Sequence, residues 1–374
     1  MCNPPLNPTR PERHYGLDFL RFISMLMIVC LHVIGNGGLL GKATPLTIKG
    51  EFVWFLEIMC YCSVNCFALI SGYLGIHSKH KWENIVSLSV QALFYCILFT
   101  IICVCTNIIQ HTPFDLIFFA KSLVPALFGR YWYFSAYFCL FFFMPILDRI
   151  VDMPKPILKR AAVLIVVVFC CVSQLQDKIS SLSEGYSFLW LAILYIVGGY
   201  IAKHNLMNTV SSQKSFLGYI ICIFITFGSK LLISSLTNAG RGSAILISYT
   251  SPTIVLASVF LLNAFVRMHI KDQFKKGILF LSSCSFGVYL IHCQPVVFDK
   301  LLANAFVGFL DQRTILLPLF IIASSILIYL VCALIEQMRK YLFKWTKIDA
   351  LVNMISTSIT KLFDMIEKPN DPMA

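Results

Sequence analysis

Apolar runs long enough to cross a membrane recur along this chain from residue 17 to residue 335. A hydrocarbon layer about 30 Å thick is crossed by about 20 apolar residues in helical conformation. Helices also satisfy every backbone polar group within their own segment, as a lipid environment demands. The runs are continuous rather than alternating, which argues against a β-barrel. The sequence therefore predicts an all-α, polytopic membrane protein with about ten transmembrane helices.

The overall composition agrees with this prediction. Of 374 residues, 58% are hydrophobic and 13% are charged, and the mean hydropathy is +0.79. Because about a quarter of the residues in a soluble domain are charged, these values exclude a soluble or disordered chain. Glycines, prolines and charges separate the apolar runs. We expect ten spans, at 17–40, 51–75, 84–109, 131–151, 158–174, 187–203, 215–236, 248–267, 277–297 and 314–335.

Lysines and arginines are distributed unequally between the two sides of these spans. Eighteen lie on the side of the N-terminus and nine on the other side. By the positive-inside rule, both termini are predicted to be cytoplasmic. We expect a cytoplasmic tail at 1–16, a ten-helix membrane domain at 17–340 and a cytoplasmic tail at 341–374. We attribute the net charge of +12 to this asymmetry and expect no nucleic acid partner.

The C-terminal tail and the cysteines carry two further expectations. Apolar residues from Ile348 to Ile366 recur at helical spacing, which predicts an amphipathic helix lying on the membrane surface. Most of the 15 cysteines fall inside apolar runs, without a CxxC pair or a spacing typical of metal ligands. We interpret them as small core residues and expect no metal cofactor.

The first span holds the main candidates for function, because a charge inside a membrane is costly unless it faces a partner or a cavity. GLDFLRFISMLMIVCLHVIGNGG contains Asp18, Arg21 and His32. The spacing of Arg21 and His32 places them on one helix face, roughly 16 Å apart along the axis. Asp18 can pair with Arg21. The alternatives are an interfacial ion pair for Asp18 and Arg21, and a structural role for His32.

Two other spans bring polar groups to the depth of His32. In an antiparallel hairpin of the first two spans, Glu57 lies about 3 Å from His32 along the axis. A carboxylate there can orient the imidazole, although Glu57 facing an outer cavity is an alternative. His292 and His32 each lie 15 residues beyond the start of an outward-running span. We expect the two histidines at similar depth, with His292 either bonded within the bundle or contacting a substrate.

Four motifs in this chain resemble those of one known family. They are LDFLRF followed by His32 at Arg-x10-His spacing, ISGYL in the second span, WYF in the fourth and SFGVYLIH in the ninth. Together they are similar to the integral-membrane acyltransferase family that includes bacterial O-antigen and exopolysaccharide acetylases. The resemblance implies ten core helices in the cell (inner) membrane, in contact with membrane lipid. It also implies acetyl-coenzyme A as the cytosolic donor and a hydroxyl of a surface polysaccharide or lipid-linked glycan as the acceptor.

The resemblance also implies roles for single residues. Arg21 and His32 occupy the family's essential arginine and histidine positions. We expect His32, with Glu57 beside it, to deprotonate the acceptor hydroxyl or to carry the acyl group itself. Some members carry an Arg-rich motif after the second helix, where this chain has GIHSKHKWE. We expect coenzyme contacts from Arg21, Asp18, Lys79 and Lys81.

The acceptor is expected to contact residues near the outer half of the bundle. Trp132 and Tyr133 form either an aromatic belt at the membrane surface or a platform for a sugar ring. Oxyanion donors are proposed by position among Asn65, Ser71 and Tyr73. The full set of expected substrate contacts is Trp132, Tyr133, His292, Ser71 and Tyr73. The competing functions are a transporter or flippase for a lipid-linked glycan and a sensor or structural subunit.

Overall fold

The computed structural model describes residues 13–76, 78, 80–106, 123–126, 129–154, 156–157, 160, 182–206, 210–237 and 246–367. Every regular element in this part of the chain is a helix, so the predicted all-α fold is confirmed. Seven helical segments are long and apolar enough to cross a membrane, and two shorter apolar helices join them. These nine correspond to nine of the predicted spans. The remaining one, 158–174, lies outside the described residues apart from Arg160.

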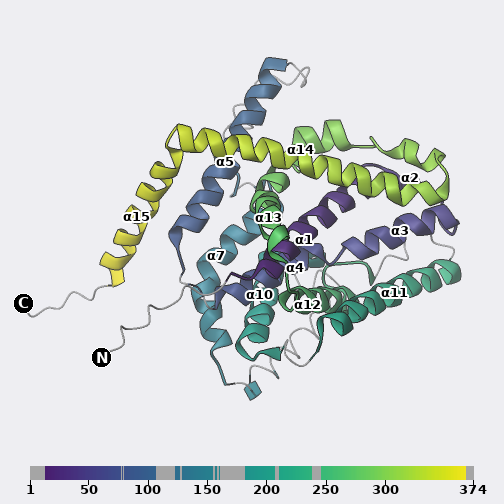
Figure 1. Ribbon diagram of the computed structural model, residues 1–374, viewed down its shortest axis with the longest axis horizontal. Coiled ribbons are helices and arrows are strands. Elements are labelled where there is room, and N and C mark those ends of the chain that lie inside the picture. The colour runs from purple at the N-terminus through teal and green to yellow at the C-terminus, as the bar shows by residue number, and fades with distance from the viewer. Residues whose placement is uncertain are drawn as a thin grey trace, which may run out of the picture.

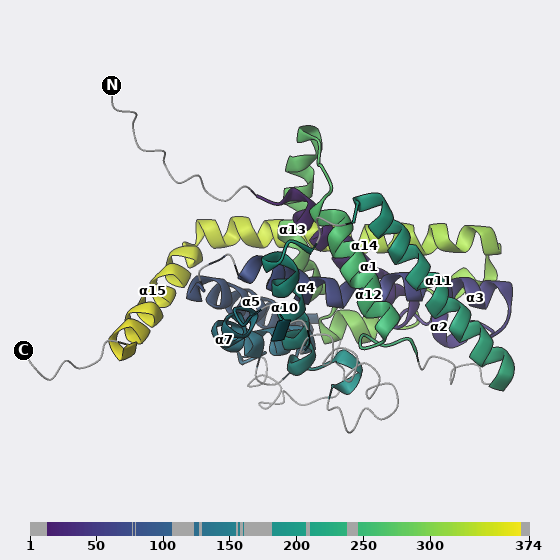
Figure 2. The same cartoon turned by 90° about the horizontal axis from the view of Figure 1, so that it is seen from below.

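Figures 1 and 2 show the helices of the bundle from two directions. In chain order they are α1 (Tyr15–Ile34), α2 (Leu39–Lys42), α3 (Ile48–Cys60), α4 (Ser63–Gly75), α5 (Trp82–Thr106), α7 (Trp132–Val151), α10 (Phe188–Lys203), α11 (Ser212–Thr237), α12 (Pro252–Val266), α13 (Asp272–His292), α14 (Leu317–Trp345) and α15 (Ile348–Glu367). The predicted span at 51–75 is divided into α3 and α4 at Tyr61 and Cys62.

Helix α1 lies in the middle of the bundle and contacts α3, α4, α12, α13 and α14 (Figures 1 and 2). It can be surrounded because its apolar residues are not confined to one side. Leu17, Leu20 and Val33 are all fully buried. Gly16 lies against the backbone carbonyl of Phe265 on α12, where a Cβ atom would not fit. Its central position places the polar groups of α1 inside the protein rather than in lipid.

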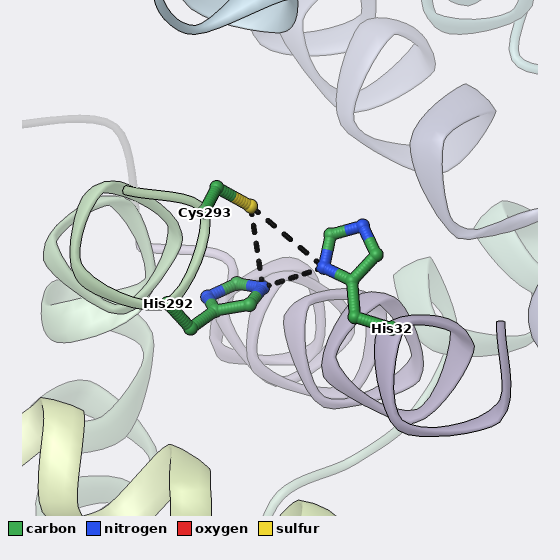
Figure 3. Close-up of side chains that lie close together, drawn as sticks. All are labelled: His32, His292 and Cys293. Atoms are coloured by element: carbon green, nitrogen blue, oxygen red, sulfur yellow. Dashed lines mark hydrogen bonds between the residues drawn. The ribbon is translucent and has the colours of Figure 1, made fainter. Parts of the chain in front are cut away.

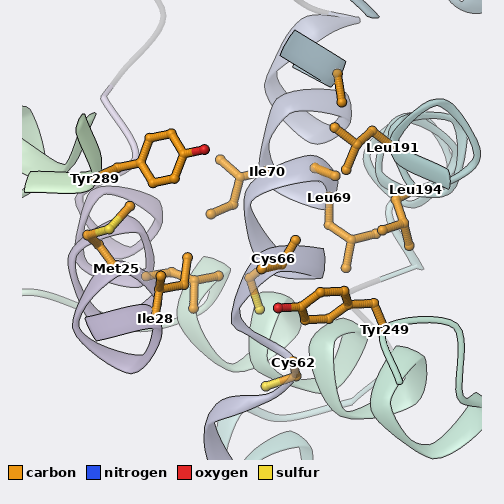
Figure 4. Close-up of a cluster of buried hydrophobic side chains, with 14 of the residues drawn as sticks. Met25, Ile28, Cys62, Cys66, Leu69, Ile70, Leu191, Leu194, Tyr249 and Tyr289 are labelled. Carbon is orange, nitrogen blue, oxygen red and sulfur yellow. The ribbon is translucent and has the colours of Figure 1, made fainter. Parts of the chain in front are cut away.

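Helices α4 and α10 cross closely through small residues. Gly72 lies against the backbone of Tyr195, and Gly198 lies against the carbonyl of Leu69, with no room for a Cβ atom at either glycine. Small residues allow helix backbones to approach in this way inside membranes. Figure 4 shows the leucines of both helices packed in the adjoining core, with Met25 and Ile28 of α1 nearby. This core fixes α4 beside α1.

The C-terminal helices confirm one prediction and correct another. Helix α14 continues to Trp345 instead of ending near residue 335. Its charges do not stop it, because Arg339 Nη2 bonds Glu336 Oε1 at 2.7 Å one turn away. Helix α15 confirms the predicted amphipathic helix. It packs against α5 and α14 and exposes apolar side chains including Leu351 and Met354, while its location on a membrane surface remains a prediction.

Candidate active site

A cavity of about 390 Å³, which we call the main cavity because it holds most of the predicted site residues, lies between α1, α3, α4, α7 and α13. Its volume is within the range of small-molecule sites. Six of the residues singled out from the sequence line it: Arg21, His32, Glu57, Ser71, Trp132 and Tyr133. One cavity therefore reaches both Arg21 and His32, which lie roughly 16 Å apart along α1. This confirms that the two residues share a helix face, and it shows that this face is the one turned to the cavity.

At one end of the cavity, Arg21 is held by an ion pair. Arg21 Nη1 donates to Asp18 Oδ1 at 3.0 Å, and Arg13 Nε donates to Asp18 Oδ2 at 2.7 Å. The Asp18 side chain is 5% exposed and that of Arg21 35% exposed. The predicted pairing of Asp18 with Arg21 is confirmed. Both carboxylate oxygens of Asp18 accept a hydrogen bond, so Asp18 orients Arg21. The other N–H donors of Arg21 are available to an anionic group in the cavity.

Three turns further along α1, His32 and His292 contact each other directly (Figure 3). His292 Nε2 lies 3.0 Å from His32 Nδ1, and His292 Nδ1 lies 2.5 Å from the backbone oxygen of Val288. A carbonyl oxygen only accepts hydrogen bonds, so His292 Nδ1 carries a proton. In neutral His292 the Nε2 atom then accepts from His32 Nδ1–H. The predicted similar depth of the two histidines is confirmed.

This chain of hydrogen bonds leaves one atom of His32 free for chemistry. With the proton on Nδ1, neutral His32 has its lone pair on Nε2. Figure 3 shows Nε2 directed away from His292 and Cys293, and no hydrogen bond to it is formed among the described residues. An imidazole that lines a cavity and is held in one tautomer, with a free lone pair, can accept a proton or act as a nucleophile.

Glu57 lies in the same cavity but does not orient His32. Its side chain is buried, and Oε2 has no hydrogen-bond partner among the described residues. The partner of His32 Nδ1 is His292 instead, so the orienting role predicted for Glu57 belongs to His292. The alternative prediction, that Glu57 faces a cavity, is confirmed. A buried carboxylate oxygen without a partner is costly and marks a place where a hydrogen-bond donor can bind.

Around Glu57 the cavity wall is formed by aromatic rings. Trp132 and Tyr186 have ring centroids 4.6 Å apart, Tyr61 and Tyr249 4.8 Å, and Tyr186 and Tyr249 5.0 Å. We call Tyr61, Trp132, Tyr186 and Tyr249 the aromatic collar. Since Trp132 and Tyr133 line the interior cavity, they do not form a lipid-facing belt. Sequence reasoning missed the three tyrosines of the collar.

A family model described as an acyltransferase domain matches residues 14–337, which is most of the chain. The chain belongs to this acyltransferase family. It is therefore a multi-pass membrane protein of the acyltransferase family, as its motifs predicted. One acyltransferase domain thus contains both the long apolar helices and the cavity lined by Arg21 and His32.

Two curated relatives also match part of this acyltransferase-family chain. Both are named probable poly-beta-1,6-N-acetyl-D-glucosamine export protein; one is from Staphylococcus epidermidis and the other from its strain RP62A. Each is 28% identical over 166 residues, which is 44% of this chain and 44% of the relative. The match thus spans less than half the length of these relatives. No solved structure gives a significant match.

Some predicted site residues of the acyltransferase domain lie away from the cavity wall. Asn65 Nδ2 donates to the Tyr249 carbonyl oxygen at 2.8 Å, and Asn65 Oδ1 accepts from Trp190 Nε1 at 3.0 Å. These bonds join α4 to α10 and to the segment before α12. Tyr73 is also absent from the wall and packs edge-on against His14. Neither residue is placed to contact a reacting group, whereas Ser71 lines the cavity.

Of the two lysines predicted to contact the coenzyme, Lys81 does not line the cavity that contains His32. Lys81 lines a second cavity of about 650 Å³, together with residues of α5, α7 and α15. Trp82 stacks on Phe363 there, with ring centroids 4.6 Å apart. Lys79 lies outside the described residues. Among the described residues, Arg21 is thus the predicted coenzyme cation that lines the cavity containing His32.

Proposed function

We propose that this protein transfers an acetyl group from cytosolic acetyl-coenzyme A to a hydroxyl of an extracytoplasmic or lipid-linked polysaccharide. The observation that carries this proposal is the single cavity lined by both Arg21 and His32. Its length along α1, roughly 16 Å, suits an extended pantetheine arm. The excess of basic residues on the N-terminal side supports a cell (inner) membrane orientation with both termini cytoplasmic and Arg21 near the donor.

Arg21 would bind the anionic end of the coenzyme, because a guanidinium offers several N–H donors in a geometry suited to phosphate. At the other end, His32 Nε2 would take the proton of the acceptor hydroxyl as its oxygen attacks the thioester carbonyl. The carbon–sulfur bond then breaks, and the coenzyme thiolate receives the proton from the imidazolium. His292 keeps its hydrogen bond with His32 Nδ1–H throughout.

An acyl-histidine intermediate uses the same atom. In that route His32 Nε2 attacks the thioester carbonyl, the carbon–sulfur bond breaks and the coenzyme leaves as a thiolate. The acceptor oxygen then takes the acyl group from Nε2, and the hydroxyl proton goes to the thiolate. Both routes require the lone pair on Nε2, and in both the bond to His292 fixes the ring. The proposal therefore depends on the tautomer of His32 and applies to either route.

The acceptor would bind at the end of the cavity that holds Glu57 and the aromatic collar. The unpartnered Oε2 of Glu57 can accept a hydrogen bond from a sugar hydroxyl. Aromatic faces pack well against the apolar C–H faces of sugar rings, and Trp132 and Tyr133 both line the cavity. The names of the two relatives refer to a polysaccharide of N-acetylglucosamine, which supports a glycan as the acceptor class.

A second candidate function is export or flipping of a glycan, and the names of those relatives favour it. A pathway for a glycan also needs polar and aromatic groups within the membrane. It does not require a cavity-lining imidazole whose tautomer is fixed by a hydrogen-bond partner. Release of free coenzyme A from acetyl-coenzyme A by the purified protein distinguishes the two functions.

The test is His32→Gln in purified protein supplied with labelled acetyl-coenzyme A. Glutamine is similar in size but cannot take the proton, and losing a general base lowers the rate about 10²–10⁴-fold. The control is His269→Gln, because His269 is exposed and does not line the main cavity. We expect normal coenzyme A release by the control and its near-complete loss in His32→Gln, with equal amounts of folded protein. Equal rates for both variants would contradict the proposal.

A further inference from the structure

Three side chains with metal-binding atoms meet where α1 and α13 approach each other. His292 Nε2 lies 3.0 Å from His32 Nδ1 and 3.4 Å from Cys293 Sγ, and Cys293 Sγ lies 3.7 Å from His32 Nδ1 (Figure 3). The three residues are separated by up to 261 positions in the sequence. Folding therefore assembles a cluster of two imidazoles and one thiol that no linear motif predicted.

The spacing of these atoms matches three corners of a tetrahedral metal site. With zinc–nitrogen distances of about 2.0–2.1 Å and a zinc–sulfur distance of about 2.3 Å, two nitrogens lie about 3.3 Å apart. A nitrogen and a sulfur then lie about 3.6 Å apart. The observed distances of 3.0, 3.4 and 3.7 Å are close to these values. Small shifts of the side chains are enough to bind an ion.

The surroundings of the cluster also suit a metal ion. The bond from His292 Nδ1 to the Val288 carbonyl is the contact that orients a metal-binding imidazole and presents its other nitrogen to the ion. Imidazole and thiolate ligands select zinc-type ions over magnesium or calcium, which prefer oxygen. Because His32 lines the main cavity, a water molecule there can complete the fourth position.

We propose that His32, His292 and Cys293 form an inhibitory site for Zn²⁺ or a similar transition-metal ion. The inhibitory part of this inference rests on the proposed function of His32. On binding, Cys293 releases its thiol proton to solvent and coordinates as thiolate. His32 Nδ1 coordinates the ion, so the single imidazole proton moves to Nε2. His32 then has no lone pair for the acceptor hydroxyl or the thioester, and metal occupancy excludes catalysis.

The binding test uses Co²⁺ as a spectroscopic substitute for Zn²⁺ in the purified full-length protein. A thiolate bound to Co²⁺ gives a charge-transfer absorption band in the near ultraviolet. We expect this band in the wild type, its loss in Cys293→Ser and its displacement by Zn²⁺. Cys139→Ser is the matched control, because Cys139 is an exposed cysteine of α7, and it should keep the band. A missing band in the wild type, or a band that persists in both Cys293→Ser and Cys293→Ala, overturns the site.

The activity test measures acetyl transfer during titration with Zn²⁺. We expect inhibition of the wild type that a chelator reverses. Cys293→Ser should keep the basal rate, with an inhibition constant for Zn²⁺ at least about 10–100-fold higher, since even outer-sphere metal contacts are worth that much. Stimulation by Zn²⁺, or equal inhibition of the two proteins, overturns the inhibitory role. Cobalt binding in a protein without transferase activity supports the site and contradicts the proposed function instead.

Discussion

Two buried glutamates in this protein lie in opposite situations. Glu336 on α14 is 1% exposed, and Glu57 on α3 is 7% exposed. Glu336 accepts hydrogen bonds from Gln91 at 3.0 Å, from Tyr95 at 2.8 Å and from Arg339 at 2.7 and 3.0 Å. Glu57 Oε2 has no partner among the described residues and faces the main cavity. A buried carboxyl group with several hydrogen-bond partners joins helices, whereas one without a partner beside a cavity is available to a ligand.

The largest effect on stability is expected for Glu336→Ala. Removing this carboxylate takes the ion-pair partner from Arg339, whose side chain is 11% exposed, and leaves Tyr95 and Gln91 without their bonds to it. Breaking a buried ion pair in this way costs about 3–5 kcal/mol. The measurement is the thermal unfolding midpoint of the purified protein in detergent.

Gly287→Ala provides an independent check on the same contact, because an added methyl group would collide with the Glu336 side chain. We expect lower stability in both variants, with acetyl transfer per folded molecule unchanged. A midpoint equal to that of the wild type in both would show that this cluster does not hold α5, α13 and α14 together.

For Glu57→Gln the comparison predicts the reverse pattern, with stability kept and activity reduced. The substitution does not remove a partner of any other described residue, so the unfolding midpoint should not fall. Leaving a buried donor of the acceptor without its partner costs about 1–3 kcal/mol, and KM for the acceptor should rise by about tenfold. Steady-state kinetics with a varied acceptor measure this change, and an unaltered KM would exclude Glu57 from acceptor binding.

Arg21 combines both situations, since it pairs with Asp18 and lines the cavity. Because Arg13 also bonds Asp18, Arg21→Ala leaves Asp18 paired and should destabilise the protein only slightly. We expect a rise of about tenfold in KM for acetyl-coenzyme A, with the acceptor KM unchanged. Arg21→Lys should restore part of this loss, as an ammonium cannot make bidentate phosphate contacts. An unchanged KM for acetyl-coenzyme A in Arg21→Ala would show that Arg21 serves only as the ion-pair partner of Asp18.

Much of the fold could be predicted because the length of an apolar run is a local property. The nine described spans and the amphipathic α15 follow from it. The predicted helix ends were less accurate, because contacts between side chains determine where a helix ends. Helix α14 extends to Trp345 because the ion pair of Glu336 with Arg339 allows charged residues within the helix. Helices α3 and α4 are separated at Tyr61 and Cys62, and a continuous apolar run does not reveal such a break.

The site could be predicted where its residues share one helix. Arg21 and His32 were found from their spacing on α1, and the depth of His292 followed from counting residues along α13. Contacts between helices were harder. The collar residue Tyr186 directly precedes the span at 187–203, and Tyr249 lies at the start of the span at 248–267. Aromatic residues at the outer ends of inward-running spans were the signal that could have found them. Nothing in the spacing of Cys293 indicated its contact with His32, because that contact depends on how α13 packs on α1.

The central claim is that one cavity carries an acyl group across the membrane from the side of Arg21 to His32. Sealed inside-out vesicles, with labelled acetyl-coenzyme A outside and the glycan acceptor enclosed, test it directly. We predict that label accumulates on the enclosed acceptor in vesicles with wild-type protein and not in vesicles with His32→Gln at equal abundance. Transfer that needs acetyl-coenzyme A and acceptor on the same side, or that continues in His32→Gln, would contradict the claim.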